Sequence, residues 1–142
     1  AVVRASNVSH IAHLAAVLMP YCQANPVSGG LINVIGTLNV FEAARDAREA
    51  SGRDIRISYA SSSAVWGPED KYEDRPLNEH DTPLPSTHYG IFKHANESSA
   101  RVFFQTNQIS SFGLRPWTVY GPGRDAGLTA APFVLPLSLN AQ

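Results

Sequence analysis

Three short apolar runs, separated by two segments of helical character, constrain the fold of this chain most strongly. The runs lie at 8–16, 54–60 and 109–114, and each suits a strand. Between them, apolar side chains recur at helical spacing over 31–50, and Ser86 or Thr87 can N-cap a second helix reaching about residue 105. The order strand, helix, strand, helix, strand predicts consecutive parallel strands joined by crossover helices, and therefore an α/β fold.

Turn and loop residues divide these segments. Asn25-Pro26 and Gly29-Gly30 are typical of a turn. Gly52 suits a left-handed C-cap at the end of the first long helix. Loops are expected at 69–85 and 116–129, and an atypical tail with two prolines among leucines is expected at 131–142.

The composition allows one domain with a real core and no strongly charged partner. Of the 142 residues, 44% are hydrophobic, and 11 basic against 12 acidic side chains leave a formal net charge of −1. This balance gives no electrostatic footprint for nucleic acid or a membrane surface. The apolar stretch at 11–19 is too short to span a bilayer, and no signal peptide is visible. Cys22 is the single cysteine, so we expect a buried structural thiol and a reducing cytoplasm.

Tyr89 and Lys93 are the strongest candidates for chemistry. They stand four residues apart near the start of the second predicted helix, so their Cβ atoms share one face, about 5–6 Å apart. Tyrosine, with an ordinary pKa of about 10, is a poor base at neutral pH, but an ammonium within about 4 Å favours the phenolate by up to roughly 4 kcal/mol. We therefore expect a lowered pKa for Tyr89, where general-base catalysis is efficient. The spacing alone is also typical of an exposed aromatic and cation pair.

Four further sequence runs lie before and after Tyr89 and Lys93, and their order along the chain can be compared with known proteins. The first follows a predicted strand, the second begins a helix, the third ends a strand in serines, and the fourth follows the last strand. Together with Tyr89-Gly-Ile-Phe-Lys93, they resemble the extended short-chain dehydrogenase/reductase superfamily, the nicotinamide-dependent sugar epimerases, dehydratases and their relatives, over about residues 8–129. In chain order, the runs are His13-Leu-Ala-Ala16, Asn33-Val-Ile-Gly-Thr37, Ser61-Ser-Ser-Ala-Val-Trp-Gly67 and Leu114-Arg-Pro-Trp-Thr-Val-Tyr-Gly-Pro122.

The resemblance implies roles for individual side chains. Ser62 stands four residues before Trp66, which replaces the usual tyrosine of the serine run, and so corresponds to the catalytic Ser/Thr. It would bond the substrate hydroxyl beside Tyr89, the general base, while Lys93 would support the phenolate and bind the cofactor ribose. Ser63 is the second choice for the role of Ser62, and a cap or backbone bond at the strand end is the plainer expectation for Ser61 and Ser63. The implied cofactor contacts are Leu14, Ala15, Ala16, Asn33, Tyr89, Lys93, Pro116 and Val119, and the implied substrate contacts are Ser62, Ser63, Trp117 and Thr118.

Three departures from the family pattern narrow the implied chemistry. Dehydratases carry an acidic pair just after the Ser/Thr, where this chain has Ser63 and Ala64, so dehydration is disfavoured. Thr118 stands where many nucleotide-sugar enzymes have Asn, as in glucuronate-epimerase-like members, so a nucleotide-sugar substrate stays open. No G-x-G-x-x-G phosphate turn occurs in the 142 residues. Roughly the first two βα units of the family and most of its C-terminal substrate lobe have no counterpart here.

Other kinds of site are weaker. The five histidines form no metal constellation, because His10 and His13 are expected on opposite faces of a strand, and we expect no metal. A hydrolase triad built on Ser62 lacks the G-x-S-x-G elbow. Arg115 is expected in a structural ion pair or bonded to backbone rather than in catalysis. Two loop aromatics either flank nicotinamide and substrate or cover the core, namely Trp117 and Tyr120.

We therefore expect residues 1–130 to form a fragment of a doubly wound, Rossmann-like parallel sheet with helices on both faces. The implied parent activity is oxidoreduction or epimerisation, with NAD or NADP, at a hydroxyl-bearing carbon of a sugar or sugar-nucleotide-like substrate. Two alternatives stay open for the chain by itself, a catalytically silent remnant and a small-molecule or nucleotide binding module. We expect a homo-oligomer, and weak or no binding of NAD by this chain alone.

Overall fold

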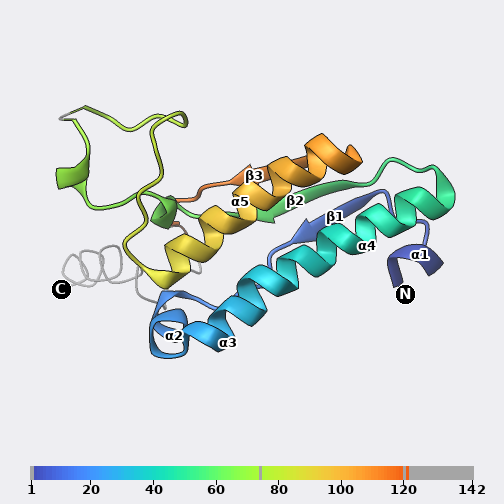
Figure 1. Ribbon diagram of the computed structural model, residues 1–142, viewed down its shortest axis with the longest axis horizontal. Helices are drawn as coiled ribbons and strands as arrows, with labels where there is room; N and C mark the ends of the chain where they lie inside the picture. Colours follow the sequence, from blue (N-terminus) through green and yellow to red (C-terminus); the bar gives the residue numbers. More distant parts are fainter. Residues whose placement is uncertain (1, 74, 120, 122–142) are drawn as a thin grey trace, which may run out of the picture.

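The computed structural model describes residues 2–73, 75–119 and 121, and a three-stranded parallel sheet lies at its centre (Figure 1). The strands are β1 (His10–His13), β2 (Arg56–Ala60) and β3 (Ser111–Leu114), in the spatial order β1-β2-β3. The predicted parallel order is confirmed, although each strand is shorter than the run that predicted it. The tail expected at 131–142 lies outside the described residues.

Two long crossover helices, α4 (Gly36–Ser51) and α5 (His88–Asn107), link neighbouring strands. Thr87 is the N-cap of α5, and its Oγ1 accepts a hydrogen bond of 3.1 Å from the backbone N of Gly90. Gly52, with a φ of 68°, ends α4 in the left-handed conformation, as predicted. The other helical elements are α1 (Val2–Ala5), α2 (Met19–Ala24), α3 (Pro26–Gly30), a π-helical turn (Leu31–Ile35) and two 3₁₀ turns (Ser63–Val65 and Glu69–Lys71).

One predicted turn is helical instead. Pro26 occupies the first position of α3, where its missing N–H costs nothing, and the helical backbone continues through Gly29 and Gly30 into the π-helical turn. The predicted turn at Gly29-Gly30 is wrong because Gly29 serves close packing. A Cβ at that position would lie 3.1 Å from Sγ of Cys22 and 3.2 Å from the ring of Phe92.

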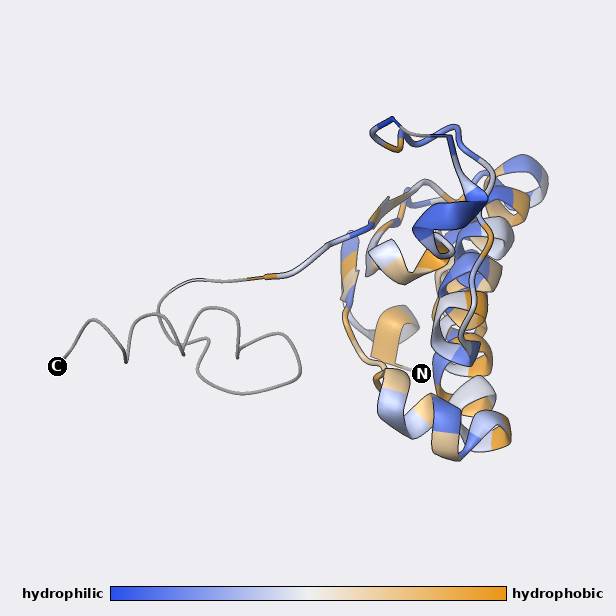
Figure 2. Cartoon of the chain, turned by 90° about the vertical axis from the view of Figure 1, so that its left-hand side faces the viewer, coloured by the Kyte–Doolittle hydropathy of each residue, from blue (hydrophilic) through white to orange (hydrophobic). Residues whose placement is uncertain are grey.

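The core lies between the sheet and the helices α4 and α5, which run side by side (Figures 1 and 2). Phe41 of α4 is fully buried, with its ring centroid 6.1 Å from that of Tyr59 on β2 and 5.1 Å from that of Phe103 on α5. Each large apolar side chain buried this way contributes about 1.5–3 kcal/mol, so this layer holds both helices on the sheet. The buried cluster consists of Phe41, Ala44, Ala47, Ile55, Ile57, Tyr59, Ala100 and Ile109.

The helical run Pro26–Ser51 is long and apolar enough to cross a membrane by length and composition alone. The same run packs against the sheet through Phe41, Ala44 and Ala47, which are buried in the core. Its C-terminal half also carries charged side chains, among them Arg45, which pairs with Glu42 at 2.5 Å.

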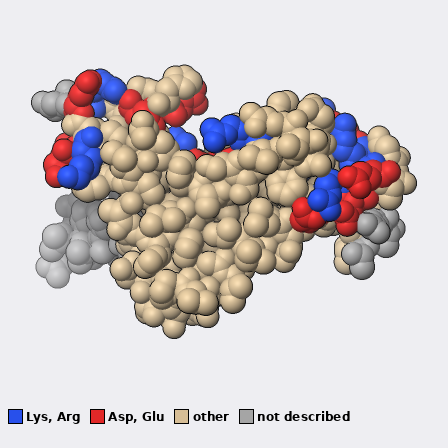
Figure 3. All heavy atoms as spheres, viewed as in Figure 1, with Lys and Arg blue, Asp and Glu red and all other residues tan. Residues whose placement is uncertain are grey.

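The outer surface of the helical layer is charged at its ends and uncharged over a broad middle area (Figure 3). The C-terminal part of α4 supplies one charged end, and the loop with Arg75 and Asp81, which pair at 2.6 Å, supplies the other. The exposed apolar side chains of the helices include Leu31 and Ile35 of the π-helical turn and Ile91 of α5. We term these three residues the helix-face patch.

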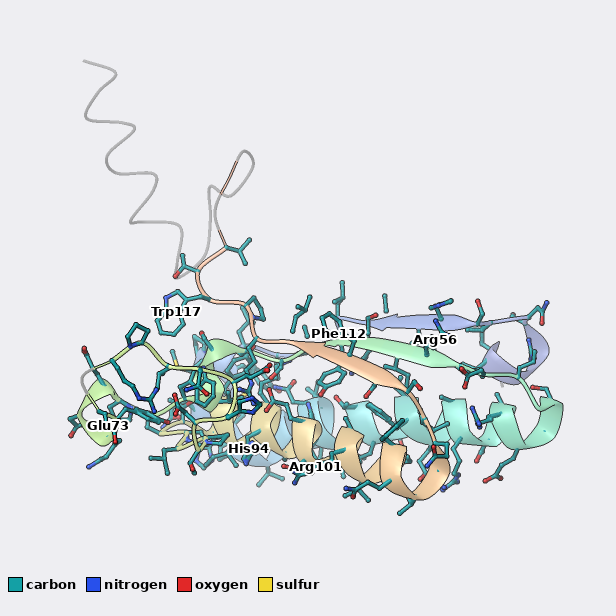
Figure 4. The ribbon with its side chains drawn as sticks, turned by 90° about the horizontal axis from the view of Figure 1, so that it is seen from above. Arg56, Glu73, His94, Arg101, Phe112 and Trp117 are labelled. Carbon is teal, nitrogen blue, oxygen red and sulfur yellow. The ribbon has the colours of Figure 1, made fainter. Side chains whose placement is uncertain are left out.

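The opposite face of the sheet carries no helix among the described residues (Figure 4). Phe112 and Leu114 of β3 are 62% and 58% exposed there. In the register of the sheet, Ser58 lies beside Phe112 and Ala60 beside Leu114. Both long helices in the described part of the chain therefore cover a single face, whereas helices were predicted on both faces.

Candidate active site

The carboxyl ends of the strands and the N-terminus of α5 meet at one end of the sheet (Figure 1). After β2 the chain passes through Ser61, Ser62 and Ser63, termed here the serine turn. Ser62 is the N-cap of the 3₁₀ turn that follows, and its Oγ accepts a hydrogen bond of 3.1 Å from the backbone N of Ala64. Open parallel sheets bind ligands at the carboxyl ends of their strands. The serine turn therefore stands where a ligand site is expected.

Tyr89, in the first turn of α5, lies against the serine turn. The Ser62 hydroxyl is near enough to the Tyr89 phenol to lower the pKa of that phenol. This close approach requires Gly90, because a Cβ at that position would lie 2.0 Å from the backbone O of Ala64. The structure thus brings together Ser62 and Tyr89, while their catalytic roles stay predictions.

The pKa of Tyr89 is raised above its ordinary value, opposite to the expectation. Burial is the larger cause, and it outweighs the hydrogen bond with Ser62, which lowers the pKa. Nζ of Lys93 lies 5.5 Å from the Tyr89 ring centroid, but its hydrogen bond of 2.6 Å goes to the backbone O of Ala60. The predicted lowering of this pKa is therefore wrong for the chain by itself, because the ammonium is directed at the end of β2.

Lys93 is a buried cation, only 4% exposed. Burial lowers its pKa, and the neighbouring Cys22 acts in the opposite direction. Cys22 is fully buried, as predicted for a structural thiol, and burial raises its pKa. The lysine thus lies next to Tyr89 with a fixed backbone partner at the strand end.

Asn33 shapes the loop that follows β1. Its Oδ1 accepts a hydrogen bond of 2.8 Å from the backbone N of Val17, and its Nδ2 donates one of 2.8 Å to the backbone O of the same residue. Nδ2 also lies 3.3 Å from Sγ of Cys22. The side chain predicted to lie near the cofactor is therefore engaged in holding this loop. Three predicted cofactor contacts belong to the loop, the exposed Leu14 and Ala15 and the half-buried Ala16.

Sequence reasoning missed a polar network beside Lys93. Nε2 of His13 lies 2.9 Å from Oγ1 of Thr37, which donates a hydrogen bond of 2.7 Å to the backbone O of Asn33. Nδ2 of Asn96 donates to that same carbonyl at 2.9 Å and to Oγ1 of Thr37 at 3.2 Å. Burial, and then the charge of Lys93, lower the pKa of His13, so its ring is neutral at pH 7.

The histidines do not form a metal site in the described part of the chain. His13 points to the helices, whereas His10 is exposed on the opposite face of β1, as predicted. No group of three or more His, Cys, Asp or Glu side chains that could hold a metal ion occurs among the described residues.

Glu97 is absent from the residues predicted from the sequence, yet it links three segments. Its carboxylate accepts two hydrogen bonds of 2.7 Å from Nε and Nη2 of Arg115, and one of 2.5 Å from Oγ of Ser61. Burial by itself raises the pKa of Glu97, but the bonds from Arg115 and Ser61 outweigh it and leave the pKa lowered. Arg115 therefore takes part in a structural ion pair, as predicted. The available signal was spacing, since Glu97 follows Lys93 by four residues on α5.

A pocket of about 760 Å³ opens beside the serine turn. Ser63, Trp66 and Trp117 contribute to its lining, so two of the predicted substrate contacts share one cavity. Trp117 is 73% exposed at its edge (Figure 4). Of the other residues predicted in this loop, Pro116 and Val119 are exposed, Thr118 is half-buried, and Tyr120 lies outside the described residues.

Known proteins resemble this chain along most of its length. The model of the NAD dependent epimerase/dehydratase family matches residues 1–137. UDP-glucuronate 4-epimerase 6 of Arabidopsis thaliana is 36% identical over 116 residues, which are 80% of this chain and 24% of that protein. The chain thus spans about a quarter of the length of the curated relatives it matches.

Two solved structures agree with this match. UDP-N-acetylglucosamine 4-epimerase from Methanobrevibacter ruminantium M1, in complex with UDP-N-acetylmuramic acid, is 26% identical with a TM-score of 0.76, over 94% of this chain and 42% of that one. MoeE5 in complex with UDP-glucose and NAD is 33% identical with a TM-score of 0.69, over 83% of this chain and 38% of that one. The likeness confirms the predicted fold class, a fragment of a doubly wound, Rossmann-like sheet.

Proposed function

Because this chain belongs to the NAD-dependent epimerase/dehydratase family, we propose that it carries the catalytic segment of an enzyme that oxidises a hydroxyl-bearing carbon of a sugar nucleotide. The observation that carries the proposal is the meeting of Ser62, Tyr89 and Lys93 at the carboxyl end of β2, where the buried Lys93 ammonium lies 5.5 Å from the Tyr89 ring centroid. The substrate class is supported by relatives whose names give UDP sugars.

The described residues suit one end of a nicotinamide dinucleotide. The Tyr89 hydroxyl and the Lys93 ammonium are donors of the kind that bind ribose hydroxyls, and the exposed backbone at Leu14 and Ala15 borders the same end of the sheet. A bound NAD or NADP would supply a hydride acceptor or donor at nicotinamide C4, and NAD is present in the related MoeE5 complex. No glycine-rich phosphate turn occurs in the 142 residues, so the donors named here serve the ribose end alone.

Tyr89 moves the proton in this proposal. During oxidation its phenolate takes the proton of the substrate hydroxyl as hydride leaves the same carbon, and during reduction the phenol returns that proton to the ketone oxygen. The raised pKa of Tyr89 keeps the resting phenol protonated at neutral pH, in the form of a proton donor. A cation brought closer to it would favour the phenolate. The Ser62 hydroxyl holds the substrate oxygen beside Tyr89.

The serine turn favours epimerisation or simple dehydrogenation over dehydration. Ser63 and Ala64 follow Ser62, and neither can act as the general acid that elimination of water requires. The pocket beside Ser63 offers the rings of Trp66 and Trp117 to a sugar. In an epimerase the hydride returns to the opposite face of the ketone, whereas a dehydrogenase releases the ketone as product.

A second candidate is a catalytically silent, oligomerising or binding module in the reducing cytoplasm. The resting position of Lys93 favours it, because its ammonium bonds to the backbone O of Ala60 while the pKa of Tyr89 is raised. The exposed apolar helix-face patch suits a homo-oligomer, and the fully buried thiol of Cys22 suits a chain without a disulfide.

Titration of NAD into the purified 142-residue chain by calorimetry tests both candidates. A few hydrogen bonds of roughly 1 kcal/mol each must offset the cost of immobilising the ligand, so we expect a Kd in the millimolar range or weaker. Lys93→Ala is expected to abolish this binding, whereas Lys71→Ala, at an exposed lysine of the second 3₁₀ turn, leaves it unchanged. Micromolar binding that Lys93→Ala abolishes would overturn the silent module. Binding indifferent to Lys93→Ala would contradict the catalytic assignment.

A further inference from the structure

We propose that Glu97 is a positioning residue, which holds the Ser62 hydroxyl against the Tyr89 phenol by tying the serine turn to α5 and to the segment after β3. The catalytic importance of Ser62 and Tyr89 rests on the proposed function. Their relative position does not depend on it. Glu97 lies eight residues after Tyr89 on the same helix, so it acts on Ser62 through other groups rather than by contact with a reacting atom.

The Glu97 carboxylate fixes the first residue of the serine turn. Oε1 accepts the 2.5 Å hydrogen bond from Oγ of Ser61, whose side chain is 2% exposed. The same carboxylate is held by both N–H groups of the Arg115 fork at 2.7 Å, a bidentate arrangement that sets orientation as well as distance. A rigid carboxylate on α5 therefore anchors the residue directly before Ser62.

Ser63, the last residue of the serine turn, is held by the segment that contains Arg115, the other partner of Glu97. The guanidinium of Arg115 lies over the ring of Trp66, 4.4 Å from its centroid. The next residue, Pro116, accepts a hydrogen bond of 3.0 Å at its backbone O from the backbone N of Ser63. Ser62 is thus held between two anchored neighbours, and both anchors depend on the ion pair of Glu97 with Arg115.

A change at Glu97 could alter the pKa of Tyr89 in two ways, through the lost charge or through a displaced Ser62, and the two effects have opposite signs. Ser61, Arg115, His94 at 3.8 Å and Tyr59 face the Glu97 carboxylate. Three groups act on Tyr89: Lys93 lies 5.5 Å from its ring centroid, Ser62 lowers the pKa of this phenol, and Cys22 raises it. Loss of a negative charge nearby would make the phenolate easier to form, and so lower the pKa of Tyr89. Moving the Ser62 hydroxyl away from Tyr89 would raise this pKa, so the direction of the change separates the two effects.

The test is a ¹⁹F NMR titration of the 142-residue chain labelled with 3-fluorotyrosine, with the Tyr89 resonance assigned from Tyr89→Phe. Ser62→Ala is expected to raise the pKa of the labelled Tyr89, and this rise sets the reference. Glu97→Gln is expected to raise the same pKa by a similar amount, with no further rise in the variant that carries both changes. Glu49→Gln, at an exposed position of α4, is the matched control and is expected to leave the pKa unchanged.

Circular dichroism will show whether Glu97→Gln folds, and a second variant tests the proposal if it does not. Arg115→Lys keeps the positive charge but loses the bidentate fork, and it is expected to raise the pKa of Tyr89 as Ser62→Ala does. A folded Glu97→Gln or Arg115→Lys chain in which this pKa is unchanged or lower would overturn the proposal, as would a Ser62→Ala chain without the rise. The titration needs no cofactor and no turnover, so its failure is distinguishable from failure of the proposed function.

Discussion

The three adjacent serines after β2 have different partners despite their identical chemistry. Ser61 is buried and donates to Glu97, whereas Ser62 caps the 3₁₀ turn and lowers the pKa of Tyr89. Ser63 donates its backbone N–H to Pro116 and lines the pocket. The motif alone ranks Ser62 above Ser63 by position, and the contacts of these side chains agree with that ranking. Its catalytic role stays a prediction.

Glu97→Gln is expected to destabilise the chain by about 2 kcal/mol at neutral pH, the usual size for hydrogen bonds to a charged group. The folded pKa of Glu97 is lowered. Its contribution to stability is therefore complete above the unfolded pKa of about 4.3, and it is lost as the pH falls through the folded pKa. The stability gap between wild type and variant should narrow on acidification below about pH 4, as measured by urea unfolding at several pH values.

Glu49→Gln is the control for this pH dependence, because Glu49 is exposed and its nearest described cation, Nε of Arg45, lies 3.9 Å away. Exposed pairs of this kind contribute about 0–1 kcal/mol, so a small effect is expected at neutral pH. A stability gap for Glu97→Gln that stays constant from neutral pH to pH 3 would show that the carboxylate charge does not contribute as described.

At the scale of elements, α5 can approach the 3₁₀ turn Ser63–Val65 closely because Gly90 has no side chain. Gly90→Ala is expected to destabilise the fold by about 1–3 kcal/mol, because the new Cβ would lie 2.0 Å from the backbone O of Ala64 and 3.1 Å from Cβ of Pro85. Gly36→Ala is the matched change in α4, where the nearest atom is 3.9 Å away, and it should stabilise the helix by roughly 0.5–1 kcal/mol. Urea unfolding of both variants measures the difference, and equal effects would contradict the close approach.

The sequence predicted elements well where local chemistry decides them. The cap at Thr87, the left-handed Gly52 and the parallel strand order all follow from side-chain types and periodicity. The turn at Gly29-Gly30 failed because a glycine also serves where another element approaches closely, here Cys22 and Phe92. Such contacts join distant parts of the chain, and local patterns do not report them.

In the candidate site too, local spacing was predicted correctly, whereas contacts between distant residues were not. The spacing of Tyr89 and Lys93 correctly placed both near the start of α5. Burial raises the pKa of Tyr89, and the Lys93 ammonium bonds to the backbone O of Ala60, 33 residues away in sequence, so the sign of this pKa shift could not be derived from spacing. Glu97 was missed for the same reason, because its partners Ser61 and Arg115 lie on other elements.

At the scale of the whole molecule, the described chain leaves two apolar surfaces open. Phe112 and Leu114 are exposed on the outer face of the sheet, and the helix-face patch is exposed on the helices. Figure 3 shows a broad uncharged area on the helical side of the molecule, between two charged ends. Exposed apolar patches rimmed by charge are typical of interaction sites.

We expect the purified chain to self-associate through the helix-face patch, with a second copy as the partner, because symmetric pairing would remove apolar surface from water at about 25 cal/mol per Å². Static light scattering should give a mass above that of one chain at high concentration. Ile35→Lys with Ile91→Lys should shift this mass to the monomer, since both side chains are more than two-fifths exposed on the patch. Phe112→Lys with Leu114→Lys is the matched change on the opposite face and should leave the mass unchanged. A monomer at all concentrations would contradict self-association, and a mass lowered only by the second pair would place the contact on the sheet instead.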